Sequence, residues 1–332
     1  MQAISSGRPS SLISLALTGI LVALLGVAAE TAIQPAANAA AASTPRCFGR
    51  AVTLVGSGVI NGTEGDDVIV GSDGDDTITG FGGDDLLCGL AGDDLIRGGL
   101  GDDRIDGADG NDRLLGDVNA DEFPGANQKG GDDYILGGPG NDSSVGDHRS
   151  IFGGDVSGDS GDDVFIGGSG NDFFWGDTFA FFGAALGKAG DDTILLGDGI
   201  DGTVGDHNAL HNLGDAGDDF IDGGAGDDFA LIGDSSYGPP SAEVTFEGKA
   251  GDDVILGGAG NDHLIGDHNP FVGTISTPAG DDVLDGGSGD DALFGDHWAD
   301  TGGVVSGDGF DVCRGGTGTD TAALCEVIKD VP

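Results

Sequence analysis

The sequence predicts an all-β solenoid, and its glycine content, its charge and its repeat period are the observations that predict it. The chain has 69 glycines among 332 residues, which excludes a conventional helical or α/β core. Its 59 acidic and 12 basic residues give a net charge of -47 at pH 7. Nucleic acids and acidic membrane surfaces would be repelled, so cations are the expected partners. Apolar residues nevertheless recur at a fixed interval, which a disordered chain has no reason to show.

A nine-residue repeat begins at Gly65 and organises the rest of the chain. In each copy a glycine is followed two residues later by an aspartate and four residues later by an apolar residue, as in Gly65, Asp67 and Ile69. Six copies follow one another directly, and after Gly116 the copies come in pairs separated by insertions, giving twenty in all. The apolar-centred segments predict short strands that turn one side chain inward, and the glycines permit tight turns between them.

The charges of such a solenoid require a cation. One inward side chain per repeat makes a thin core, and aspartates on adjacent coils, about 4.8 Å apart, would repel by roughly 3 kcal/mol per pair at an effective dielectric of 20. Calcium suits carboxylates and turn carbonyls because it accepts six to eight oxygen ligands in irregular geometry, whereas magnesium requires a strict octahedron. We therefore expect folding and calcium binding to be one event, with the calcium-free chain unfolded.

The repeat matches the pattern Gly-Gly-x-Gly-x-Asp-x-apolar-x, and over roughly residues 56–323 the chain is similar to the RTX, or haemolysin-type, calcium-binding repeat family. The resemblance implies a right-handed parallel β-roll in which two nonapeptides make one coil and calcium lies between successive turns along each edge. It also implies that glycine carbonyls and the aspartate of each repeat are the ligands. These aspartates are Asp67, Asp76, Asp85, Asp94, Asp103, Asp112, Asp133, Asp142, Asp163, Asp172, Asp192, Asp201, Asp219, Asp228, Asp253, Asp262, Asp282, Asp291, Asp311 and Asp320.

Two repeats per coil place every insertion on the same edge of the roll. We expect the opposite edge to carry an uninterrupted column of aspartates and the best-formed calcium sites. The chain is accordingly divided into a signal peptide (1–39), an N-terminal cap (40–61), uninterrupted repeats (62–115), repeat pairs with insertions (116–323) and a C-terminal cap (324–332).

Each insertion opens with Gly-Asp, and four of these dipeptides are followed by histidine. One hypothesis is that the aspartates accept hydrogen bonds from loop amides and the histidines pack beside them. The other is a second file of cations, either calcium or, with histidine nitrogen, a transition metal. The residues are Asp117, Asp147, Asp177, Asp206, Asp234, Asp267 and Asp296, with His148, His207, His268 and His297.

One stretch is strongly aromatic. Its rings are expected to bury one another and to cover the thin core, and a polysaccharide-binding face is the alternative. The residues are Phe173, Phe174, Trp175, Phe179, Phe181 and Phe182.

The N-terminal segment and the cysteines indicate export. Arg8, the apolar run at 12–29 and the small residues near Ala39 are typical of a cleaved signal peptide; an uncleaved membrane anchor is the alternative, and no later stretch is long enough to span a membrane. An even number of cysteines in an exported chain favours disulfides. Of the three connectivities we favour the one that closes each end of the array, where terminal turns fray. Its pairs are Cys47 with Cys88 and Cys313 with Cys325.

No catalytic residue and no organic cofactor are predicted. Only about 20 residues separate the signal peptide from the first repeat, too few for a catalytic domain, and neither His-Glu-x-x-His nor Gly-x-Ser-x-Gly occurs. The N-terminal signal and the cysteines depart from the RTX members exported by a C-terminal signal, which puts toxin activity in doubt. The chain looks most like stand-alone secreted bacterial members of the family. A calcium-driven structural or adhesive role outside the cell is expected; the alternatives are a polysaccharide- or cell-surface-binding module using the insertion loops and a hydrolase on the insertion edge.

Overall fold

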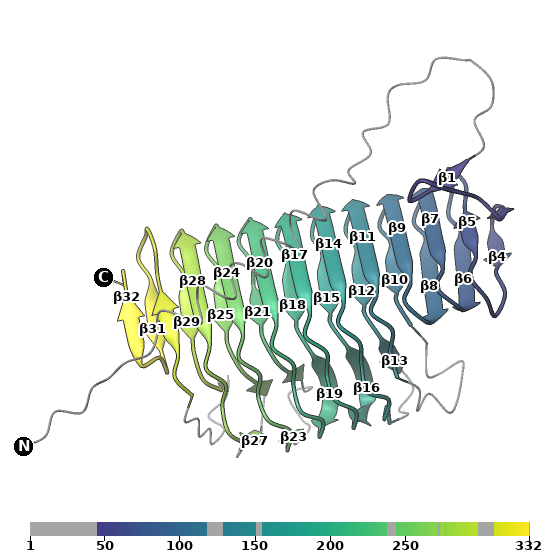
Figure 1. Cartoon of the computed structure of the whole chain (residues 1–332). Helices are drawn as coiled ribbons and strands as arrows, with labels where there is room; N and C mark the ends of the chain where they lie inside the picture. The colour runs from purple at the N-terminus through teal and green to yellow at the C-terminus, as the bar shows by residue number, and fades with distance from the viewer. Residues whose placement is uncertain are drawn as a thin grey trace, which may run out of the picture. The chain divides into compact units, whose positions relative to one another are not determined.

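The computed structural model describes residues 45–117, 129–150, 155–237, 244–270, 273–275, 277–297 and 309–331. Within these ranges the chain forms strands and turns and no helix, and so no helix there could cross a membrane. The expected signal peptide at 1–39 lies outside the described residues. Successive strands alternate between two long sheets that run side by side along the molecule (Figure 1).

All strand pairs in these two sheets are parallel, and each strand pairs with the equivalent strand one coil away. The first sheet consists of β3 (Leu54–Val55), β5 (Val68–Val70), β7 (Leu86–Ala91), β9 (Arg104–Asp109), β11 (Tyr134–Pro139), β14 (Val164–Ser169), β17 (Thr193–Asp198), β20 (Phe220–Ala225), β24 (Val254–Ala259), β28 (Val283–Ser288), β30 (Val312–Arg314) and β32 (Val327–Lys329). The second sheet consists of β4 (Val59–Asn61), β6 (Thr77–Gly82), β8 (Leu95–Leu100), β10 (Arg113–Leu115), β12 (Ser143–Val145), β15 (Phe173–Trp175), β18 (Gly202–Val204), β21 (Ala230–Ile232), β25 (His263–Ile265), β29 (Ala292–Phe294) and β31 (Thr321–Ala323). The parallel β-roll expected from the sequence is therefore confirmed.

The core consists of two rows of stacked side chains, one row from each sheet. Ile69, Leu87 and Ile105 lie on neighbouring strands of the first sheet and are fully buried. Phe174 in the second sheet stacks on a core phenylalanine of the first, with 4.4 Å between ring centroids. Its ladder neighbours are Ser144 and Thr203, whose hydroxyls each donate to a backbone carbonyl at 3.1 Å. The two small residues leave room for the large ring, and their polar atoms are satisfied within the core.

Among the described residues, the insertions between 148 and 275 stack into a third sheet, which the sequence did not predict. Every insertion leaves a strand of the second sheet and returns to a strand of the first, so all lie on one edge, as expected. A small buried cluster of Val156, Ala180, Ala185 and Ala209 holds its first strands together. The strands of this sheet, which we call the insertion sheet, are β13 (His148–Ser150), β16 (Thr178–Ala185), β19 (His207–Asn212), β22 (Ser236–Tyr237), β23 (Val244–Phe246), β26 (Asn269–Pro270) and β27 (Gly273–Ile275).

The aromatic stretch divides between the inside and the outside of the roll. Phe174 belongs to the core, whereas Trp175 packs against Phe173 and Phe179 at centroid distances of 4.5 and 4.6 Å outside the core file. Phe229, two coils further on, joins them at 5.9 Å from Phe173. The side chains of 181 and 182 lie outside the described residues.

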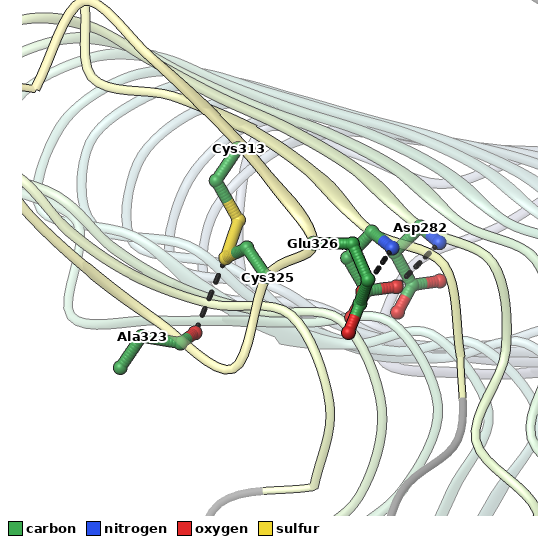
Figure 2. The surroundings of a disulfide bond; sticks show 6 residues. Asp282, Cys313, Ala323, Cys325 and Glu326 are labelled. Atoms are coloured by element: carbon green, nitrogen blue, oxygen red, sulfur yellow. Dashed lines mark hydrogen bonds between the residues drawn. A yellow bond between two sulfur atoms is a disulfide. The ribbon is translucent and has the colours of Figure 1, made fainter. Parts of the chain in front are cut away.

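The two expected disulfides are confirmed, and each closes one end of the array. Cys88 of β7 bonds to Cys47 in β1 (Arg46–Cys47), which forms a short antiparallel pair with β2 (Arg50–Ala51). Cys313 of β30 bonds to Cys325 (Figure 2). Both bonds indicate an oxidising compartment.

The disulfide that closes the longer loop is expected to contribute more to stability. The Cys47–Cys88 and Cys313–Cys325 bonds span 41 and 12 residues, which corresponds to about 4 and about 3 kcal/mol in the loop-entropy model. Replacing each pair by serines and following urea unfolding in saturating calcium measures both values. Equal losses from the two replacements would show that strain or packing, rather than loop length, sets the effect.

Candidate metal centre

Aspartates, all buried except the partly exposed Asp67, line each edge of the roll in a column with one member per coil. In both columns the Oδ1 atom accepts a hydrogen bond from the backbone nitrogen of the aspartate one coil earlier, as from Asp85 to Asp103 (2.7 Å) and from Asp103 to Asp133 (2.8 Å). The insertion-edge column is Asp67, Asp85, Asp103, Asp133, Asp163, Asp192, Asp219, Asp253, Asp282 and Asp311. The regular-edge column is Asp76, Asp94, Asp112, Asp142, Asp172, Asp201, Asp228, Asp262, Asp291 and Asp320.

The second carboxylate oxygen, Oδ2, lacks a hydrogen-bond partner in most of these aspartates. In eighteen of these twenty aspartates Oδ2 is buried and has no hydrogen-bond partner among the described residues. Burial, together with the charge of neighbouring aspartates, raises the pKa of Asp103 to about 8 and the pKa values of Asp85 and Asp112 to about 7. An ionised carboxylate in such a position requires a positive partner, because a buried oxygen without one costs the full desolvation penalty.

Glycines border the space into which these oxygens point. A Cβ atom on Gly137 would lie 2.5 Å from Asp142 Oδ2 and 2.7 Å from the carbonyl oxygen of Gly167, one coil further on. Gly257 repeats the arrangement at 2.6 Å from Asp262 Oδ2 and 2.7 Å from another glycine carbonyl. Among the described residues no three His, Cys, Asp or Glu side chains meet at one point. The donor set is therefore one carboxylate with glycine carbonyls, all hard oxygens, and this set fits calcium.

The two columns share the same amide-to-carboxylate hydrogen bonds, although insertions interrupt the sequence of only one. Asp253 and Asp282 are linked at 2.8 Å on the insertion edge, and Asp262 and Asp291 at 2.9 Å on the regular edge. The glycine-bordered spaces differ, because a Cβ on Gly116 or Gly233 at the insertion edge would lie closer to the aspartate Oδ2 than one on Gly137 or Gly257 at the regular edge. The expectation that the regular edge holds the best-formed sites stays a prediction. Each insertion returns the chain to the same position, so the column continues across it.

The first member of each column differs from the rest. Asp67 Oδ2 accepts hydrogen bonds from the backbone nitrogen and hydroxyl of Thr63 at 2.8 and 2.9 Å. Asp76 Oδ2 is held in the same way by Ser72, at 2.6 and 3.0 Å. These hydroxyls compete with a cation, so Asp67 and Asp76 are weaker candidates than the other eighteen.

At the opposite end Glu326 continues the insertion-edge column, a role that the sequence analysis missed. Its Oε2 accepts the hydrogen bond of the Asp311 backbone nitrogen at 2.8 Å (Figure 2). Val327 pairs with Val312, so Glu326 occupies the aspartate position of a degenerate repeat. The sequence signal was the acidic residue immediately before the apolar pair Val327 and Ile328.

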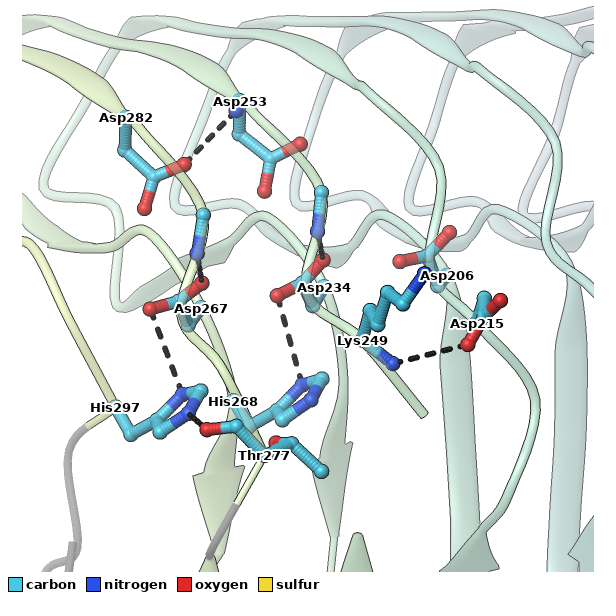
Figure 3. Close-up of polar contacts among 12 residues, drawn as sticks. Asp206, Asp215, Asp234, Lys249, Asp253, Asp267, His268, Thr277, Asp282 and His297 are labelled. Atoms are coloured by element: carbon cyan, nitrogen blue, oxygen red, sulfur yellow. Dashed lines mark hydrogen bonds and ion pairs between the residues drawn. The ribbon is translucent and has the colours of Figure 1, made fainter. Parts of the chain in front are cut away.

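The Gly-Asp aspartates form a further column on the insertion edge. Asp234 and Asp267 each accept a hydrogen bond at 2.8 Å from the first glycine nitrogen of the following repeat, Gly251 and Gly280. The other described members make the same contact at 3.0 to 3.3 Å. This geometry supports the turn-capping hypothesis for one carboxylate oxygen of each residue. All four of the histidines that follow are buried, and two of them are shown in Figure 3.

A family comparison agrees with these columns. The sequence model of the RTX calcium-binding nonapeptide repeat, which spans four copies, matches residues 61–96, 89–122, 129–147, 151–179, 213–230, 245–267 and 274–296, together more than half of the chain. A comparison with curated proteins finds no match. Sixteen of the twenty column aspartates lie within these matched segments, and Asp192, Asp201, Asp311 and Asp320 lie outside them. The chain belongs to the RTX calcium-binding nonapeptide repeat family.

Proposed function

We propose that the protein is a secreted calcium-binding repeat protein that folds when it binds calcium and serves a structural or adhesive role outside the cell. The observation that carries the proposal is the pair of continuous columns in which eighteen of the twenty Oδ2 atoms are buried without a hydrogen-bond partner in the part of the chain that the structure describes. The two disulfides support an extracellular location, because such bonds persist in oxidising compartments.

The aspartate and the glycine of each coil make different contributions to a cation site. The aspartate Oδ1 is fixed by the amide one coil earlier, which aims Oδ2 at the glycine-bordered space, and the absent glycine side chain leaves that space open. Calcium would supply the positive charge that the buried carboxylates lack. Because each contact joins two coils, binding at one site favours stacking of the next, and we expect folding to be cooperative along the roll.

The buried histidines disfavour a hydrolase on the insertion edge. His207, His268 and His297 are at most 3% exposed, so a substrate in solvent would not reach their ring nitrogens. A catalytic base must lie within hydrogen-bonding reach of the proton that it abstracts. The proposed role is therefore not enzymatic.

One surface favours a second candidate function, the binding of extracellular polysaccharide. Phe229 is 53% exposed, and Gly202 lies between it and Phe173, because a Cβ on Gly202 would be 2.8 to 2.9 Å from atoms of both rings. Partly exposed rings beside a glycine offer a flat apolar surface to a sugar. Loss of retention on cell-wall polysaccharide in Phe229→Ala would support this candidate.

Neighbouring aspartates test the calcium role directly. Asp103 is buried in the insertion-edge column, whereas Asp102 is exposed and its Oδ1 accepts only the Asp132 nitrogen at 3.1 Å. Asparagine preserves Oδ1 in both, but in Asp103→Asn it replaces the unpartnered Oδ2 by an NH₂ group. We expect Asp103→Asn to weaken calcium binding about tenfold or more and to bind fewer ions, because a charged ligand is lost.

The control variant is Asp102→Asn, which removes the same charge one residue away. It should bind calcium within about twofold of the unmodified chain, since an exposed charge is screened. Isothermal titration calorimetry gives both affinity and stoichiometry. Equal effects of the two variants would mean that net charge, and not the aspartate column, determines calcium binding.

A further inference from the structure

The first sheet has an apolar outer face in addition to the face that lines the core. Strands β11, β14, β17, β20, β24 and β28 lie side by side (Figure 1), and every second side chain in them points away from the buried core row. We call these outward side chains the outer face. All are apolar or aromatic except one threonine and two aspartates, and each keeps part of its surface accessible to solvent. The outer face consists of Tyr134, Leu136, Val164, Ile166, Thr193, Leu195, Phe220, Asp222, Val254, Leu256, Val283 and Asp285.

The composition of these strands is that of a sheet covered on both sides. Parallel sheets usually have both faces buried, and their strands then consist of continuous apolar runs. The strands that begin at Tyr134, Val164 and Val254 open with Tyr-Ile-Leu, Val-Phe-Ile and Val-Ile-Leu. In the second sheet, two strands of the same part of the roll are Ser-Ser-Val and Gly-Thr-Val. The apolar runs are therefore a property of the first sheet and not of the repeat as such.

The chain itself covers the N-terminal end of this sheet. A disulfide joins the β1–β2 pair to β7, and Phe48 and Val52 pack with Val70 of β5. The guanidinium of Arg104 in β9 lies over the rings of Phe48 and Tyr134, at 4.6 and 4.9 Å from their centroids. Among the described residues no side chain of the outer face belongs to a buried apolar cluster. The cover therefore ends at β11, and the same apolar surface continues beyond it.

The outer face is large enough for a specific contact. Six strands about 4.8 Å apart span about 29 Å, and the five residues from Tyr134 to Gly138, with their counterparts, make the face about 17 Å wide. Each copy would bury about 500 Å², and a pair about 1,000 Å², which is the lower limit for specific interfaces. Two such sheets pack face to face about 10 Å apart with interdigitated side chains.

The N-terminal segment of the mature chain is too short to cover the outer face. The expected cleavage near Ala39 leaves residues 40–44 ahead of the β1–β2 pair. Five extended residues reach at most about 17 Å, whereas the six strands span about 29 Å. A second molecule must therefore supply the cover, and another copy of this chain offers an apolar sheet of the same dimensions.

We propose that two copies of the calcium-loaded roll associate through their outer faces. The contact is a twofold one, in which the same face of each copy meets the other. The β1–β2 pair lies in the layer that the partner's sheet enters, so the two rolls run in opposite directions and the two β1–β2 pairs lie at opposite ends. The inference rests on the proposed calcium binding, because calcium in the columns offsets much of the net charge of -47 that would otherwise keep two copies apart.

Sedimentation velocity of the mature, oxidised protein in saturating calcium tests the proposal. We expect a concentration-dependent change from monomer to dimer between about 1 and 200 µM, since an interface of this size gives a weak complex. Circular dichroism of the same samples shows whether the chain is folded. A chain that stays unfolded in calcium would contradict the proposed function, whereas a folded monomer at every concentration would overturn the dimer and assign the face to a partner of another kind.

Three variants locate the interface. Ile166→Asp places a charge in the row of the outer face in which Asp222 and Asp285 occur naturally, so the strand accommodates it. We expect it to raise the dissociation constant of the dimer by about tenfold or more, because the charge becomes buried without a partner. Asp222→Leu removes such a charge and should lower the dissociation constant by about fivefold.

The control is Ile200→Asp, which adds the same charge at a side chain that is 51% exposed. Ile200 lies at the repeat position where Asn171 and Asn261 lie in other coils, so an acidic residue there is compatible with the turn. The dissociation constant should stay within about twofold of that of the unmodified chain. A dimer that survives Ile166→Asp unchanged would place the contact on another surface and contradict the proposal.

Discussion

Removal of calcium is expected to convert the protein from a β-structured roll to a coil, and addition of calcium is expected to reverse the change. Eighteen aspartates bury an unpartnered oxygen, and adjacent members of a column face the same charge one coil away. Without a cation each such pair costs roughly 3 kcal/mol at an effective dielectric of 20, and a column repeats that cost along its length. A core of one inward side chain per repeat does not offset it.

Far-UV circular dichroism of the oxidised chain, after complete chelation, measures this transition. Magnesium is the control, since it has the same charge but requires a strict octahedron and dehydrates reluctantly; it should restore little structure at concentrations at which calcium restores all of it. If the chelated chain already has the β spectrum, then the core and the disulfides suffice for folding. The unpartnered oxygens would in that case have to be protonated.

The second large effect is expected from a single methyl group at Gly83. Its φ angle is +98°, and a Cβ there would lie 2.5 Å from the Asp66 nitrogen and 2.6 Å from the carbonyl carbon of Gly65. Both contacts are with backbone, which cannot rotate away. Positive φ and overpacking together are expected to lower the free energy of unfolding by about 2–4 kcal/mol in Gly83→Ala. Urea unfolding in saturating calcium measures the change.

The matched control is Gly65→Ala. Gly65 opens the first repeat and Gly83 opens the equivalent repeat one coil later, but nothing lies within 4 Å of a Cβ on Gly65. Its replacement should change stability by no more than about 0.5 kcal/mol. Gly65 also lacks the positive φ of Gly83, so a comparable loss in both variants would show that neither the close approach of two coils nor the backbone conformation of Gly83 sets the effect.

The sequence predicted the roll because the determinants of its main sheets are local and periodic. The glycine, aspartate and apolar positions of each repeat follow from the nine-residue interval, and each of the twenty aspartates lies in one of the two columns. What the interval cannot show is which carboxylate oxygen remains free. That depends on the neighbouring coil, as the contrast between Asp67, held by Thr63, and Asp103 demonstrates.

The insertion sheet was not predicted because its strands depend on neighbours rather than on their own composition. Thr178–Ala185 is eight residues long, whereas Asn269–Pro270 is two and contains a proline. Neither alone indicates a strand, and each becomes one by pairing with the insertion on the next coil. Phe174 was grouped with the other aromatic residues, although it stands four residues after Gly170, at the inward position of its repeat; Ser144 and Thr203 on adjacent strands leave room for its ring.

The register of the aspartate columns has a consequence for how such a protein can evolve. Successive members of the insertion-edge column are 18, 30, 29, 27 or 34 residues apart, yet each accepts the same amide hydrogen bond from the preceding coil. A coil therefore presents the same upper and lower faces whatever its loop contains. Unequal recombination could therefore add or delete whole coils without creating a new interface. The loop sequences could diverge while the two main sheets and their aspartate columns stayed the same.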